Sequence, residues 1–92
     1  MRFIKQRQYN LVVNICKVKR EYTVNDIERV LEHREEYRYR EARFKRFRPT
    51  YKQVVSILEM LVLEQRAIVI QPGRSGHATK YRWKDEDGET RP

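Results

Sequence analysis

The 92-residue chain is predicted to fold as one small α+β domain, mainly helical, in which three helices precede a two-stranded β-hairpin. Three observations predict this class. Apolar residues recur at helical spacing in three stretches, and a β-branched run, a Gly-rich turn and an alternating run follow the last of them. Apolar residues make up 39% of the chain, enough for a modest core. We expect the domain to span residues 1–83 and a polar, flexible tail to span 84–92.

The third helical stretch, residues 50–66, gives the clearest signal. Thr50 is a suitable N-cap, and Gln53 three residues later completes a capping box. Pro49 excludes a helix that runs straight through from upstream. The expected apolar side consists of Tyr51, Val54, Val55, Ile57, Leu58, Leu61 and Val62. The polar side consists of Lys52, Gln53, Ser56 and Glu59, with Met60 and Leu63 also on the outer face.

Two helices are expected before it. An apolar stripe at helical spacing predicts the first over residues 3–19. Glu21 and Tyr22 form a short break, and Thr23 then caps the second helix. Asp26 lies in the first turn of that helix, where a negative charge meets the positive helix end.

The segment 33–48 is basic and rich in aromatic residues. Because it contains no Gly or Pro before Pro49, we expect the second helix to continue through roughly Arg40; an inserted basic loop is the alternative. Its aromatic residues, Tyr37, Tyr39, Phe44 and Phe47, alternate with Arg and Lys. Such a segment either stacks on bases while its cations hold phosphates, or fills core and dimer contacts while its charges are solvated.

The hairpin is expected over residues 67–83. Residues 67–71 are β-branched and apolar, and the dipeptides at 72–73 and 75–76 have turn chemistry. Tyr81 and Trp83 share one face of the second strand and are expected to pack on the domain, while Lys80 and Arg82 face the other way.

Positive charge is clustered along the chain. The net charge is +8 and the pI is about 9.9, which favours a polyanionic partner. Residues 1–20 carry six Lys or Arg and no acid, 33–52 carry eight bases against three acids, and 72–83 carry three bases and no acid. This clustering favours a binding footprint over a uniformly solvated surface.

Several functional classes find no support in the sequence. Cys16, the only cysteine, lies on an apolar helical face, so we expect a buried small hydrophobe and neither a disulfide nor a zinc site. The apolar runs are too short for a transmembrane span and the N-terminus has no signal-peptide core, so an intracellular, soluble protein is expected. With His33 and His77 as the only histidines and no phosphate-cradling motif, we expect neither an enzyme nor a cofactor nor a small-molecule ligand.

Together, TYKQVVSILEMLVLEQRAIVI and PGRSGHATKYRW give a helix that leads into a basic hairpin, and from about residue 3 to 83 the chain resembles the winged helix-turn-helix DNA-binding family. It is similar to small regulators common in archaea and their viruses, and more distantly to multiple-antibiotic-resistance-type regulators. The resemblance implies a homodimeric transcriptional regulator that places helix 50–66 in the major groove of duplex DNA and the wing 72–80 on the adjacent minor groove or backbone. The residues that the resemblance and the basic cluster place on DNA are Thr50, Tyr51, Lys52, Gln53, Ser56, Arg74, Ser75, His77, Lys80, Arg46 and Arg48. The long connection 33–48 departs from the short turn of the family.

Two other functions stay open. Winged helices also serve as protein-interaction adaptors in replication and transcription complexes, and the outer-face Met60 and Leu63 fit that role. The segment 33–48 alternatively binds RNA or single-stranded DNA.

Overall fold

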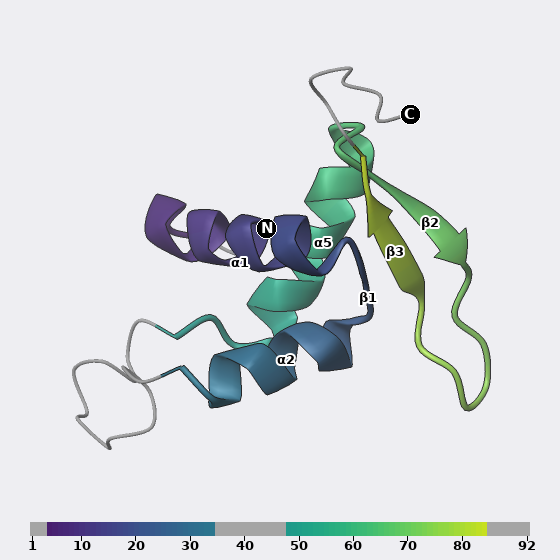
Figure 1. Ribbon diagram of the computed structural model, residues 1–92, viewed down its shortest axis with the longest axis horizontal. Coiled ribbons are helices and arrows are strands. Elements are labelled where there is room, and N and C mark those ends of the chain that lie inside the picture. Colours follow the sequence, from purple (N-terminus) through teal and green to yellow (C-terminus); the bar gives the residue numbers. More distant parts are fainter. Residues whose placement is uncertain (1–3, 35–47, 85–92) are drawn as a thin grey trace.

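The computed structural model describes residues 4–34 and 48–84 (Figure 1). In these ranges the chain forms three helices and one antiparallel sheet of three strands, which confirms the small, mainly helical α+β class. The elements are α1 (Gln6–Lys19), β1 (Glu21–Tyr22), α2 (Val24–Glu32), α5 (Tyr51–Leu63), β2 (Ala67–Gln71) and β3 (Lys80–Trp83). Arg46, the segment 35–47 with its aromatic residues, and the tail from residue 85 lie outside the described residues.

Strand β1 is the element that the sequence did not reveal. Glu21 and Tyr22, expected only as a break, pair antiparallel with Arg82 and Tyr81 of β3. The sheet order is β1-β3-β2, so the predicted two-stranded hairpin carries a third strand. Tyr22 is fully buried and its ring stacks on that of Tyr81, with 5.8 Å between the centroids. Two residues are too few to show a period-2 pattern, and only the distant partner strand makes them a strand.

Helix α1 begins at Gln6, three residues later than predicted. The Gln8 side chain marks this start, because its Oε1 accepts a hydrogen bond from the Lys5 N–H at 3.1 Å. Cys16 is fully buried on the inner face, as expected. Burial raises the pKa of its thiol to about 12, so the group stays neutral at physiological pH.

Two reciprocal capping boxes begin the other helices. Thr23 Oγ1 accepts from the Asp26 N–H at 3.2 Å, and Asp26 Oδ2 accepts from the Thr23 N–H at 2.9 Å. At α5, Thr50 Oγ1 accepts from the Gln53 N–H at 3.1 Å, and Gln53 Oε1 accepts from the Thr50 N–H at 2.9 Å. Both predicted N-caps are therefore confirmed.

The prediction that the second helix continues through Arg40 is wrong. Helix α2 ends at Glu32, with His33 as its C-cap. The N–H groups of His33 and Arg34 donate to carbonyls three residues earlier, at 3.1 and 3.2 Å. These tighter bonds close the last turn and satisfy the carbonyls that a continuing helix would use, although neither Gly nor Pro stands there.

Helix α5 ends at Leu63, three residues before the predicted end. Gln65 adopts a left-handed backbone conformation with φ of 63°, which turns the chain into β2. The core lies where the three helices meet the inner face of the sheet (Figure 1). Its most buried members are Val12, Cys16, Tyr22, Ile27, Leu31, Val54, Ile57 and Leu61, each 0% exposed.

Trp83 of β3 packs beside the C-terminal ends of α1 and α5. It is 4% exposed, which confirms that this face of β3 packs on the domain. Two cations lie over its ring, Arg66 at 5.2 Å and Lys17 at 6.0 Å from the centroid. Arg66 also donates to the Tyr9 hydroxyl at 3.1 Å, and that hydroxyl donates to Glu64 at 2.7 Å. These contacts fix the orientation of α5 and of the hairpin that follows it.

No helix among residues 4–34 and 48–84 is both long and apolar enough to cross a membrane.

Candidate nucleic-acid interface

The first turn of α5 presents exposed side chains beside the cap. Tyr51, expected on the apolar side of the helix, is instead 54% exposed. Tyr51 is the first residue of α5 and precedes the buried residues of its apolar side, which begin at Val54. Lys52 next to it is exposed and makes no ion pair among the described residues. The first turn of α5 therefore exposes both an aromatic ring and an ammonium group.

Besides completing the helix cap, Gln53 has a second structural role that the sequence did not reveal: it contacts Gln8 of α1. Its Oε1 holds the Thr50 N–H, and its amide group lies 3.3–3.4 Å from that of Gln8 on α1. Gln8 is 6% exposed, so this amide pair links α5 to α1 in a mostly buried position. A base contact by Gln53, which stays a prediction, would require these bonds to break.

Ser56 and Glu59 continue the outer face of α5. Ser56 is half-buried and Glu59 is exposed. A carboxylate on this face repels phosphates, so Glu59 limits how closely a nucleic acid approaches the middle of the helix.

The hairpin tip is a tight turn held by the backbone. Arg74 and His77 exchange two hydrogen bonds, Arg74 N–H to His77 O at 2.9 Å and His77 N–H to Arg74 O at 2.8 Å. Gly76 between them has φ of 82°, a value that favours glycine and fits the third position of a type II turn. Arg74, Ser75 and His77 are all exposed at this tip.

Thr79 anchors the base of the tip and was not singled out from the sequence. Its Oγ1 accepts from the Gly73 N–H at 3.1 Å. A Cβ atom on Gly73 would lie 2.7 Å from this oxygen and 3.1 Å from the Thr79 nitrogen, so glycine is required for the close approach. A lone Thr near a Gly-rich turn carries no specific sequence signal for such a contact.

A cleft of about 320 Å³ joins the front of α5 to the hairpin tip. Tyr51 and Glu59 line it from α5, and Arg74 and His77 line it from the hairpin. Tyr81 forms part of its wall, and burial together with the charge of Glu59 raises the pKa of its hydroxyl. The fold thus brings together residues that are 15 to 26 positions apart in the chain.

Among the predicted contacts that the structure describes, Tyr51, Arg74 and His77 line this cleft, and the others do not: Thr50, Lys52, Gln53, Ser56, Ser75, Arg48 and Lys80. Arg48 pairs with Glu28 of α2 at 3.2 Å, which ties the entry of α5 to α2. Lys80 is half-buried at the start of β3, opposite Gln71. Arg46 lies outside the described residues. A group of three or more His, Cys, Asp or Glu side chains suited to a metal does not occur in the part of the chain that the structure describes.

Comparisons of the chain with protein-family models, with curated proteins and with solved structures find no match.

Proposed function

We propose that this protein is a winged-helix protein that binds double-stranded DNA as a sequence-specific transcriptional regulator. Helix α5 would lie in the major groove, and the β2–β3 hairpin, acting as the wing, would lie on the adjacent minor groove or backbone. The observation that carries the proposal is the cleft that brings Tyr51 together with Arg74 and His77. Among the described residues, the order helix, strand, helix, helix, strand, strand and the three-stranded sheet support this proposal, because a winged helix has them in the same order.

Electrostatics support a polyanionic partner at this surface. The chain carries a net charge of +8, and Lys52 and Arg74 are exposed on the two elements that flank the cleft. Most of the affinity would come from such cations meeting phosphates and releasing counterions.

Base recognition would fall to few side chains. Lys52 has the length and charge to reach guanine O6 and N7, and Ser56 can donate to or accept from a base edge. Arg74, on a narrow tip, suits a minor groove where the potential is most negative. Thr50 and Tyr51 would contact the phosphate backbone.

A salt titration of duplex binding tests this proposal. We expect the logarithm of the association constant to fall steeply and linearly with the logarithm of salt concentration, and the slope to decrease by about 1 in Lys52→Ala and in Arg74→Ala. Glu59→Gln should strengthen binding because it removes a repelling carboxylate. Lys84→Ala is the matched control, because Lys84 is exposed after β3, beside the C-terminal end of α5 and away from both its first turn and the hairpin tip.

A salt-independent response, or an equal loss in Lys84→Ala, would contradict the proposal. Competition with single-stranded DNA and with RNA distinguishes duplex binding from the alternative that segment 33–48 binds RNA or single-stranded DNA. Sedimentation equilibrium, with and without DNA, tests the further proposal that the protein acts as a homodimer.

A protein-interaction adaptor is the second candidate function. Leu63 at the end of α5 is 82% exposed, and Ile68 of β2 is 40% exposed. Large apolar side chains exposed in this way favour contact with another protein. Absence of DNA binding together with a saturable protein complex that Leu63→Ser abolishes would favour this function over the first.

A further inference from the structure

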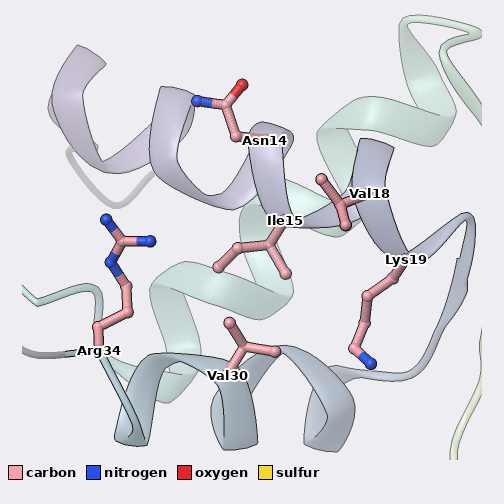
Figure 2. Close-up of a pocket in the computed structure, with 6 residues that line it drawn as sticks. All are labelled: Asn14, Ile15, Val18, Lys19, Val30 and Arg34. Atoms are coloured by element: carbon pink, nitrogen blue, oxygen red, sulfur yellow. The ribbon is translucent and has the colours of Figure 1, made fainter.

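A second concave surface lies between α1 and α2. A groove of about 360 Å³ runs between these helices, and Ile15 and Val30 face each other across it (Figure 2). Val18 stands on the α1 side and is 83% exposed, although its neighbour Ile15 is 7% exposed. We call this surface, with Asn14, Lys19 and Arg34, the α1–α2 groove. An exposed valine beside an apolar hollow is typical of a hydrophobic pocket that binds an aliphatic side chain of a partner.

The rim of the α1–α2 groove is basic. Lys19 reaches from the end of α1 toward α2, and Arg34 reaches from beyond α2 toward α1 (Figure 2). An adjoining hollow of about 420 Å³ extends the rim to Arg29 and His33. Among the described residues, Asp26 is the one acid that lines either hollow; its Oδ2 accepts the Thr23 N–H at the helix cap, and its Oδ1 lies 3.9 Å from Arg29 Nη1, which partly offsets the charge of that cation.

We propose that the α1–α2 groove binds an acidic amphipathic segment of a partner protein. Its aliphatic or aromatic side chains would insert between Ile15, Val18 and Val30, and its carboxylates would meet Lys19, Arg29 and Arg34. This combination of an apolar floor and a cationic rim matches a helix or strand that carries apolar anchors flanked by Asp or Glu.

Charge and chemistry disfavour two other occupants, a second copy of the chain and its own C-terminal tail. A second copy would bring the same cations against this rim, and like charges in contact oppose association. The tail of this chain, residues 85–92, is acidic but contains no aliphatic or aromatic residue to fill the apolar floor.

The groove is separate from the candidate DNA interface. In the part of the chain that the structure describes, the α1–α2 groove and its adjoining hollow share no lining residue with the cleft beside α5. Figure 1 shows α1 and α2 on the side of the molecule away from the tip of the β2–β3 hairpin, which lies at the right. A partner can therefore occupy the groove while the hairpin is engaged, and this inference stands whether or not the protein binds DNA.

Selection from a random displayed-peptide library against the full-length protein tests the proposal. We expect enriched peptides that combine acidic residues with two or more aliphatic or aromatic anchors. Affinity for a synthetic peptide of the enriched sequence should fall at least tenfold in Val18→Ser and in Lys19→Glu. The matched controls are Val69→Ser, since Val69 is 43% exposed on β2 and lines neither hollow, and Lys84→Glu, and both should bind the peptide normally.

Four results would overturn the proposal. The first is a selection without an enriched acidic and apolar pattern. The second is that the groove variants bind the selected peptide as tightly as the parent protein does, or that the parent protein binds a purely acidic peptide as tightly as the selected one. The latter would indicate general attraction of polyanions. The third is competition by a synthetic peptide of residues 85–92, which would assign the groove to the chain's own tail. The fourth is loss of a homodimer in Val18→Ser, which would assign it to a second copy.

Discussion

The N-cap residue Thr50 allows a test of how much one hydrogen bond stabilises α5, the helix at the front of the candidate site. Thr50 Oγ1 accepts the Gln53 N–H at 3.1 Å, while the reciprocal bond from the Thr50 N–H to Gln53 Oε1 does not use the threonine side chain. Thr50→Ala therefore removes one half of the capping box and leaves the other. Thr50 is exposed, so the change removes little buried apolar area.

The expected loss of unfolding free energy in Thr50→Ala is about 1 kcal/mol, the usual cost of removing an N-cap acceptor. In a domain of this size that loss corresponds to a decrease in Tm of roughly 4–8 °C. Urea unfolding followed by circular dichroism measures the free energy, and thermal unfolding measures Tm. Thr50→Ser is the matched control, because serine keeps the acceptor oxygen and loses only a methyl group.

We expect Thr50→Ser to recover most of the stability lost in Thr50→Ala. If both variants lose the same free energy, the methyl group is responsible and not the hydrogen bond. If Thr50→Ala is as stable as the parent, the capping box does not stabilise α5, and the reasoning that derives the helix start from this motif is refuted.

Three further predictions concern the thiol, the sheet and the hairpin. Because burial raises the Cys16 pKa from 9.0 to about 12, its neutral thiol contributes full stability below pH about 9, and this contribution is lost as pH rises toward 12. Urea unfolding at neutral pH and at pH about 10 should show this loss, with a smaller loss in Cys16→Ala. Arg82→Ala breaks an ion pair with Glu21 whose bonds are 2.9 and 3.1 Å, yet the side chains are 51% and 41% exposed. Its unfolding free energy should fall by less than about 1 kcal/mol and the difference should shrink in high salt; a larger, salt-independent loss would contradict this. Gly73→Ala should displace the Thr79 backbone, seen as a shifted Thr79 amide resonance, and weaken duplex binding severalfold with little change in Tm. An unchanged Thr79 resonance would show that the close approach is not required.

The features that the sequence predicted correctly are those set by neighbouring residues. Thr23 and Thr50 cap helices because the cap and its partner lie three positions apart. The burial of Tyr81 and Trp83 follows from strand alternation. Local chemistry alone is sufficient for each of these predictions.

Features that depend on distant residues were not predictable in the same way. Strand β1 exists because Tyr22 pairs with Tyr81, a residue on another element of the fold. Helix α2 stops after Glu32 without a Gly or Pro signal. The cleft that joins Tyr51 to Arg74 results from the packing of the hairpin beside α5, and periodicity within one element does not contain that information.

The central claim is that the front of α5 and the hairpin tip form one DNA-binding surface. The most direct test is to titrate the ¹⁵N-labelled protein with duplex DNA and to follow the backbone amide resonances. We predict that the largest shifts fall on residues 50–59 and 73–80, with small shifts in the α1–α2 groove. Shifts that centre on the α1–α2 groove, or an unchanged spectrum at saturating duplex, would contradict the claim.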